Sequence, residues 1–339
     1  MKKLLIATTA LVGTASVAGA DIANFNFSGY GRFGILYEED RTADQTSDNV
    51  SNPTSAEETR FESRFRLNIS AATTTDGGIR FAAFTRVEMN DNADNTSNTG
   101  SFSGPRFQAS SGGLRVQVGN ISGVTDAAEV VDYFGFEPGL IGQTGQYANS
   151  GVSLPAFAST GAGNNGISVK YEVGDFAVMG SWTDDHDTNE GSPARGGDFI
   201  ESYEIGASYS FSGWTVGAAY GSFEQTANLN GGVGDATAAS DNDFWVITAN
   251  GSLGIADVSF LISDFDGDAD TVFGASASFP VGASTAILAS VSDGGAATND
   301  TSYGLGFRHS LGGGVRLDGM VGSNEKGNTI ADLGVRFDF

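Results

Sequence analysis

The chain of 339 residues is strongly acidic, with 41 Asp and Glu residues, 17 Lys and Arg residues and a formal net charge of −24. This charge argues against a nucleic-acid partner, because binding to a phosphate backbone requires a basic surface. The chain has no cysteine, which excludes disulfides and thiolate metal sites, and its 24 Phe residues indicate a folded body rather than a disordered chain.

Residues 1–20 have the organisation of a secretory signal peptide. Met1-Lys2-Lys3 is a short positive start, residues 4–17 are mostly apolar, and Ala18-Gly19-Ala20 is a cleavage site of small residues. The apolar run is shorter than the roughly 20 residues of a membrane-spanning helix, which is the alternative interpretation. We expect residues 1–20 to be removed on export and residues 21–339 to form a single domain, with 15 Lys and Arg against 41 Asp and Glu and a formal charge of −26.

After this segment, strand-like runs follow one another, and the connections between them alternate between short and long. Short links such as residues 173–175, 212–213 and 312–314 fall at every second connection, and longer polar stretches fill most of the others. This alternation is typical of outer-membrane barrels, which have tight turns at one end and longer loops at the other. Sixteen strands, enough to enclose a water-filled lumen, are predicted at 25–37, 59–71, 79–90, 105–111, 113–119, 166–173, 175–183, 199–211, 214–223, 243–252, 256–264, 271–279, 283–291, 301–311, 314–322 and 329–339.

The first and last of these strands indicate a closed sheet. In residues 25–37, Phe25, Phe27 and Phe33 fall on one face and Arg32 on the other, and residues 330–339 alternate in the same way. One face therefore suits hydrocarbon and the other suits water. Because a strand in lipid can satisfy its backbone only in a closed barrel, the predicted fold is an all-β, 16-stranded antiparallel transmembrane barrel in the outer membrane of a Gram-negative bacterium. A soluble β-sandwich or solenoid is the alternative.

Residues 120–165 break the rhythm of the connections. A connection of 46 residues without regular alternation is normally functional, and in a barrel of this size it can fold into the lumen and narrow it. It carries four acidic residues close together, Asp126, Glu129, Asp132 and Glu137. We expect residues 120–165 to form an inward-folded constriction loop with an acidic face.

Basic residues gather on the polar faces of the predicted strands before residue 116. Eight of the fifteen cations that follow the signal peptide lie there, namely Arg32, Arg60, Arg64, Arg66, Arg80, Arg86, Arg106 and Arg115. Such a wall opposite acidic loop residues would create a transverse field, which orients dipolar solutes and favours small polar molecules. Two alternatives are that the arginines pair with carboxylates such as Glu62 and Glu88, and that the loop acids are ordinary solvated residues. The candidate basic wall of the constriction consists of Arg32, Arg64, Arg66, Arg86 and Arg115.

Four segments at both ends and in the middle of the chain carry a family resemblance: Phe27-Ser28-Gly29-Tyr30-Gly31-Arg32-Phe33-Gly34, Val118-Gly119-Asn120-Ile121-Ser122-Gly123, Tyr303-Gly304-Leu305-Gly306 and residues 330–339. They resemble segments of trimeric general-diffusion porins, especially the Rhodobacter-type alphaproteobacterial branch. This resemblance implies a homotrimer of sixteen-stranded barrels with a third loop bent into each channel. It also implies an acidic eyelet role for Asp126, Glu129, Asp132 and Glu137, and a basic one for Arg32, Arg64 and Arg86.

A short acidic loop is a further candidate site. Its acids Asp264, Asp266, Asp268 and Asp270 stand at alternate positions, and such oxygen ligands suit calcium. Ala275, however, stands where an EF-hand loop has its glutamate, and the alternative is a solvated loop tip. Catalysis is not expected, because the chain has only two histidines and no evident nucleophile beside a base.

Together these features predict a passive outer-membrane channel for small hydrophilic solutes and ions, with no cofactor apart from the candidate calcium ion. A modest cation preference is expected from the acidic external loops, the first of which contains Glu38, Glu39, Asp40, Asp44, Asp48, Glu57 and Glu58. Two alternatives are a solute-selective channel with a binding track and a structural or adhesive barrel with a plugged lumen. The expected partners are other copies of the chain in a homotrimer, outer-membrane lipid and lipopolysaccharide, and small hydrophilic solutes.

Overall fold

The computed structural model describes residues 24–41, 57–92, 100–152, 154–161, 163, 165–184, 199–225 and 240–339. The expected signal peptide and the loop residues Asp44 and Asp48 lie outside these ranges. Within the ranges, no helix is long and apolar enough to span a membrane.

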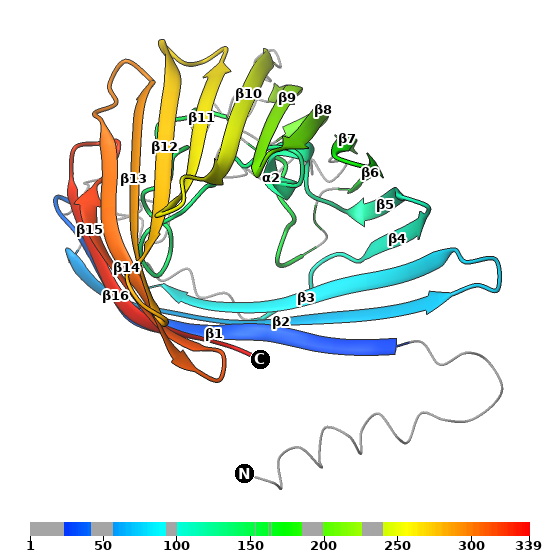
Figure 1. Ribbon diagram of the computed structural model, residues 1–339, viewed down its shortest axis with the longest axis horizontal. Helices are drawn as coiled ribbons and strands as arrows, with labels where there is room; N and C mark the ends of the chain where they lie inside the picture. The colour runs from blue at the N-terminus through cyan, green and yellow to red at the C-terminus, as the bar shows by residue number, and fades with distance from the viewer. Residues whose placement is uncertain are drawn as a thin grey trace, which may run out of the picture.

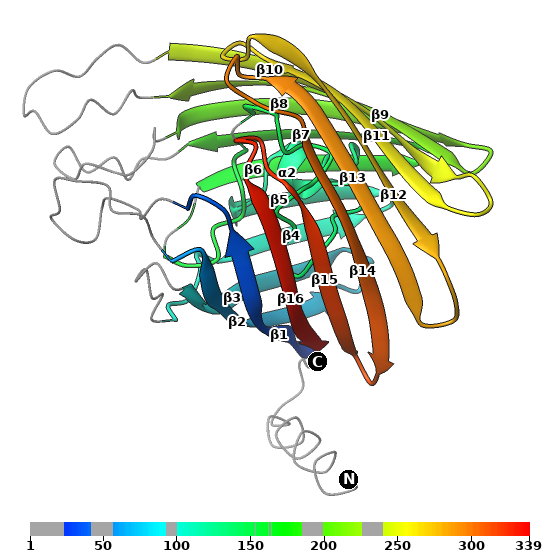
Figure 2. The ribbon, with the colours of Figure 1, turned by 90° about the vertical axis from the view of Figure 1, so that its left-hand side faces the viewer.

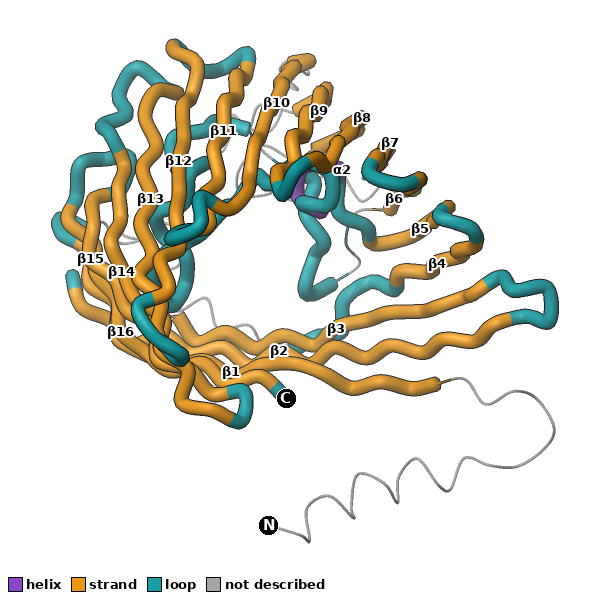
Figure 3. Tube along the Cα trace, viewed as in Figure 1, coloured by secondary structure: helices purple, strands orange, loops and turns teal. Residues whose placement is uncertain are grey.

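The described residues form a closed barrel of sixteen antiparallel strands, in which each strand pairs with its neighbours in sequence and the first pairs with the last (Figure 1). A short helix, α2 (Val124–Ala127), lies inside the ring of strands (Figure 3). The strands are β1 (Asn24–Glu38), β2 (Thr59–Thr74), β3 (Arg80–Asn92), β4 (Arg106–Ser111), β5 (Leu114–Asn120), β6 (Asn165–Val173), β7 (Phe176–Asp184), β8 (Phe199–Phe211), β9 (Trp214–Gln225), β10 (Ser240–Ser252), β11 (Asp257–Phe265), β12 (Asp270–Pro280), β13 (Thr285–Gly295), β14 (Ser302–Gly312), β15 (Val315–Ser323) and β16 (Thr329–Asp338).

The barrel closes where β1 meets β16, in a register that runs from Tyr30 opposite Asp338 to Glu38 opposite Ile330. The predicted number, order and direction of the strands are confirmed. Several strands run further than predicted: β10 begins at Ser240 rather than 243, and β13 ends at Gly295 rather than 291. These extra residues are mostly polar or glycine, and backbone pairing continues through them beyond the apolar band that marks a strand in the sequence.

The two faces of the wall differ as the alternation predicts. On the outside, Phe25, Phe33 and Leu333 are more than half exposed, as side chains that meet hydrocarbon should be. On the inside of β1, Tyr30 and Leu36 are buried. Seen from the side, the strands run obliquely, with short turns at one end, here called the turn end (Figure 2). The strand ends that the longer connections join lie at the opposite end, here called the loop end.

The inner face is not polar throughout, and this differs from the simple alternation. A buried cluster inside the barrel contains Phe223 of β9, Phe244 and Val246 of β10 and Leu261 of β11. Tyr133, from the connection between β5 and β6, packs among them. These strands are apolar on both faces because lipid meets one face and a protein segment covers the other.

Candidate functional site in the channel lumen

The connection between β5 and β6, here called the constriction loop (residues 121–164), follows the inner wall of the barrel (Figure 3). Its backbone hydrogen bonds mark its course: Thr125 N donates to Glu204 of β8 (2.7 Å), Asp132 N to Thr248 of β10 (3.0 Å), Phe136 N to Ser276 of β12 (2.8 Å) and Leu140 N to Asp332 of β16 (2.9 Å). The loop then returns, and Ser159 accepts a hydrogen bond from Arg86 of β3 (2.9 Å). The predicted inward fold of this segment is confirmed.

Glycines on the inner wall allow the loop to lie directly on the strands. A Cβ atom on Gly217 would lie 1.9 Å from the carbonyl oxygen of Val130, and one on Gly274 would lie 1.8 Å from that of Gln146. A Cβ on Gly304 would lie 2.0 Å from the hydroxyl of Thr144. No other residue fits at such distances, so these glycines, here called the inner-wall glycines, fix the position of the loop.

Two of the four candidate acids help to hold the loop in shape. Asp132 accepts a hydrogen bond from the hydroxyl of Ser259 on β11 (2.7 Å) and another from the backbone of Gly135 (3.2 Å). Glu137 accepts one from the hydroxyl of Tyr147 (2.7 Å), and burial raises the pKa of the Glu137 carboxyl. Both acids are therefore part of the internal structure of the loop as well as its surface.

The other two acids face the basic wall. Glu129 forms ion pairs with Arg115 (2.6 Å) and Lys170 (2.9 Å). Burial opposes its charge, but these two partners outweigh burial and lower the pKa of Glu129. Asp126 accepts a backbone hydrogen bond from Phe157 (3.4 Å), and burial raises its pKa. Only Glu129 among the four thus touches a cation at ion-pair distance within the described residues.

The candidate arginines of the wall lie on the inner face, and most of them contact a carboxylate. Arg32 pairs with Glu62 (2.7 Å), Arg66 with Glu88, and Arg64 lies 3.6 Å from Glu88. Pairing with Glu62 and Glu88 is the alternative to an unpaired basic wall that the sequence also allowed.

Arg86 instead hydrogen-bonds to neutral groups, including Asn68 of β2 (2.9 Å). Its guanidinium carbon also lies 4.8 Å from the centre of the Phe157 ring, and that of Arg106 lies 5.3 Å from the same ring. Phe157 thus connects the returning part of the constriction loop to two arginines through cation–π contacts.

Barrel closure adds arginines that the sequence did not place on this wall. Arg336 of β16 stands opposite Arg32 of β1, and Arg316 of β15 stands opposite Arg336. Since Arg32 also faces Arg64 of β2, four arginines occupy consecutive positions across four strands. We call these four residues the arginine row. Each lies on the polar face of its strand, but only the register of the closing pair reveals the row.

The candidate calcium ligands do not converge. Asp264 accepts a hydrogen bond from Thr271, Asp266 from the backbone of Asp243, and Asp268 from the backbone of Gly151. In the part of the chain that the structure describes, no group of three or more His, Cys, Asp or Glu side chains could hold a metal ion.

Comparison with known proteins agrees with this architecture. A model of the Gram-negative porin family matches residues 7–329. The porin of Fuscovulum blasticum is 30% identical over 317 residues, which are 93% of this chain and 99% of that protein. Two solved structures of Rhodopseudomonas blastica porin, a triple mutant at 28% identity and a double mutant at 29%, each have a TM-score of 0.73 and cover 93% of this chain and 100% of their own. The closed sixteen-stranded barrel, its inward-folded loop and these similarities show that the chain belongs to the Gram-negative porin family.

Proposed function

We propose that the outer-membrane diffusion channel formed by this chain passes small hydrophilic solutes and ions with a modest preference for cations. The observation that carries this proposal is that carboxylates pair with the basic wall. Glu62, Glu88 and Glu129 offset much of the charge of Arg32, Arg66 and Arg115, so the wall attracts anions less than its arginines alone would.

The carboxylates at the loop end of the channel also favour cations. Glu39, Asp40, Glu57 and Glu58 lie on either side of the first long connection. A hydrogen bond from Thr329 lowers the pKa of Glu39, which keeps this carboxyl ionised. An acidic mouth concentrates cations over about one Debye length, roughly 10 Å at 0.1 M salt.

Within the constriction, we propose that Asp126 and Glu137 supply the acidic side of a transverse field, and that the basic wall supplies the other side. Among the described residues neither acid forms an ion pair, whereas Glu129 is held by two cations. Asp126 is close enough to Arg86, and Glu137 to Arg308, for each arginine to favour the ionised form of the acid. Water and dipolar solutes that pass between these charges would be oriented by them.

The reversal potential across a potassium chloride gradient tests the preference. We expect a cation-selective sign at about 0.1 M salt that fades towards about 1 M, where the Debye length falls to about 3 Å. The double variant Glu39→Gln and Asp40→Asn should reduce the preference. The double variant Asp76→Asn and Asp175→Asn removes the same charge at the turn end and is the matched control for total charge. A chloride-selective sign at low salt would mean that the arginines dominate, and the proposal would be wrong.

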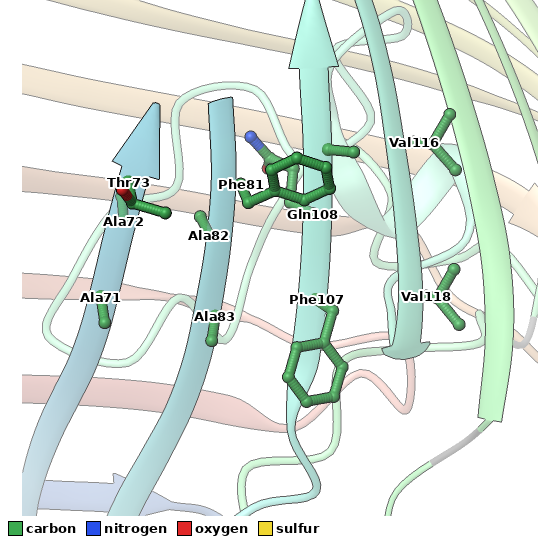
Figure 4. Close-up of a pocket in the computed structure, with 11 residues that line it drawn as sticks. Ala71, Ala72, Thr73, Phe81, Ala82, Ala83, Phe107, Gln108, Val116 and Val118 are labelled. Atoms are coloured by element: carbon green, nitrogen blue, oxygen red, sulfur yellow. The ribbon is translucent and has the colours of Figure 1, made fainter. Parts of the chain in front are cut away.

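We further propose that the functional unit is a homotrimer whose subunits meet through the outer face of β2–β5. A groove of about 380 Å³ lies there, where Ala71 and Ala83 leave space beside Phe81 and Phe107 (Figure 4). Small residues beside large ones on a lipid-facing surface permit close packing against another protein surface. The family resemblance supplies the choice of a second copy of this chain as the occupant. Export with removal of residues 1–20 and contact with lipopolysaccharide are parts of the same proposal.

A further inference from the structure

Two arginines at the turn end of the channel share one buried carboxylate. Arg308 of β14 donates from Nε to Oδ1 of Asp318 (3.1 Å), and Arg316 of β15 donates from Nε to Oδ2 of the same residue (2.7 Å). The Asp318 side chain is 1% exposed, whereas those of Arg308 and Arg316 are 40% and 25% exposed. One carboxylate therefore fixes two guanidinium groups, and these three residues carry a net positive charge. Glu137 of the constriction loop lies close enough to Arg308 to offset part of that charge.

The outer nitrogens of both guanidinium groups remain available. Each arginine donates to Asp318 from Nε alone, so that carboxylate leaves the donors of both Nη atoms unused. Neither Arg308 nor Arg316 donates from Nη to any residue that the structure describes. A planar guanidinium fork with free Nη donors matches the oxygens of a carboxylate or phosphate group.

These donors line a cavity of about 440 Å³, together with hydroxyl-bearing residues such as Ser284 and Ser310. Arg308 and Arg316 lie on the inner face of their strands: Gly306, two residues before Arg308, contacts the loop residue Pro138, and Met320, four residues after Arg316, lies beside Gly139 of the same loop. The cavity is therefore open to solutes in the lumen.

The arginine row leads to this cavity. Arg64 is the sixth residue of β2 counted from the loop end, whereas Arg316 is the second residue of β15 counted from the turn end. Strands in such barrels are tilted by about 35–45°, so a row that crosses them at right angles runs obliquely along the channel. The row thus descends from the constriction to Arg316.

We propose that Arg308 and Arg316, aligned by Asp318, form a binding site for the phosphate or carboxylate group of a soluble solute at the turn end of the channel. The site depends on the proposed channel function for its supply of solute. Binding of the anion by the two arginines does not depend on that function. Anions meet the first members of the arginine row, Arg64 and Arg32, at the constriction, follow the row towards Arg316 and are held briefly at the cavity before they leave.

Calorimetric titration of inorganic phosphate into the detergent-solubilised full chain tests the site directly. We expect saturable binding of one phosphate per chain, weakened about tenfold by Arg316→Gln, because the variant loses charge-assisted hydrogen bonds to the anion. Arg80→Gln removes the same charge from the turn end of β3 and is the matched control, which should change binding less than twofold. Equal losses in the two variants, or no saturable binding in the unmodified protein, would overturn the proposal.

Asp318→Asn separates an aligned site from simple charge attraction. This variant makes the site more positive, so a diffuse electrostatic model predicts tighter phosphate binding. The proposed site predicts weaker binding, because the two guanidinium groups lose the carboxylate that orients them. Tighter binding in this variant would contradict the site.

Two further measurements identify the source of the anion and separate the site from the channel. Acetate should compete with phosphate, whereas phosphatidylglycerol should not, because the cavity faces the lumen; competition by the lipid would move the site to the outer surface and overturn the proposal. Phosphate added at the turn end should lower single-channel conductance in the unmodified protein and not in Arg316→Gln. Normal conductance without phosphate binding would contradict the proposed binding site but not the channel function. Phosphate binding without conductance would contradict the channel function but not the binding site.

Discussion

At the scale of single residues, the shape of the channel depends on glycines of the inner wall, which have no side chain. The inner-wall glycines Gly217, Gly274 and Gly304 bring the constriction loop within a distance that no Cβ atom tolerates. The loop is therefore held against the wall by backbone contact as well as by hydrogen bonds. The width of the channel follows from this close approach.

Replacement of Gly274 by alanine should displace the loop towards the centre of the lumen. The new Cβ would lie 1.8 Å from the Gln146 carbonyl oxygen, and overpacking of this kind typically costs about 1–3 kcal/mol. We expect a lower single-channel conductance and a lower temperature of thermal unfolding. Gly282→Ala is the matched control, because nothing lies within 4 Å of its added Cβ. If the two variants behave alike, the inner-wall glycines do not position the loop.

The same scale shows what the sequence could and could not provide. The inner position of Arg32, Arg64 and Arg66 follows from alternation alone, because a strand has a period of two. Alternation also places Glu62 and Glu88 on the same face, but which arginine each carboxylate contacts depends on cross-strand register and side-chain reach. The role of Gly274 was also hidden, because a glycine in a strand does not reveal which segment approaches it.

At the scale of elements, the constriction loop acts as a lining for half of the barrel. It covers the apolar inner faces of β9–β11, where Phe223, Phe244 and Leu261 would otherwise meet water. This arrangement also limits what periodicity can show for β9–β11. A strand covered on both faces is apolar on both faces, and periodicity alone cannot distinguish the lipid side from the protein side.

Deletion of residues 126–137 should raise single-channel conductance in molecules that form a barrel, because it removes the part of the loop that crosses β8–β14. Replacement of Arg64 and Arg86 by serine should also widen the channel and weaken the proposed transverse field, with less risk to folding. The control is the pair Arg64→Gln and Arg86→Gln, which removes the same charges but keeps more of the side-chain volume. Unchanged conductance in the deletion and in the serine variant would place the constriction elsewhere.

At the scale of the whole molecule, the strand count and order were predictable because each strand is specified by local alternation and each turn by its own short link. Closure was predictable as well, since an open edge in lipid is too costly. The register at the closing pair was not, and with it the sequence missed the arginine row. Arg336 faces Arg32 from the other end of the chain, so no local pattern connects the two halves of the row.

The trimer is a prediction at this scale. Cross-linking or native mass measurement in mild detergent should show three copies of the chain. Ala83→Trp would fill the groove on the outer face of β2–β5 and should favour the monomer. Ala289→Trp, on the outer face of β13, is the matched control and should leave the trimer intact. A monomer in the unmodified protein would contradict the assembly.

Removal of Phe339 should impair assembly in the outer membrane. Its backbone exchanges hydrogen bonds of 2.8 Å and 3.0 Å with Gly29, and its ring stacks on Phe65 with centroids 5.8 Å apart. The deletion loses these contacts at the seam between β1 and β16. Heat-modifiable, membrane-inserted protein measures the effect, and Phe339→Leu keeps the backbone pair and so separates its contribution from that of the ring. Normal levels in the deletion strain would argue against a role in closure.

The seam between β1 and β16 also bears on the order of folding. Gly34 and Gly334 are neighbours in the barrel although 300 positions separate them in the chain, so their contact carries a large loop-closure entropy and must wait until both terminal strands are in place. At that step Arg32 comes opposite Arg336, and like charges in such positions repel. Glu62 pairs with Arg32, and Asp338 pairs with Arg336, and these carboxylates offset the repulsion. An incomplete barrel therefore lacks both its seal and its arginine row, so the charge pattern of this wall is complete only after the two terminal strands have paired.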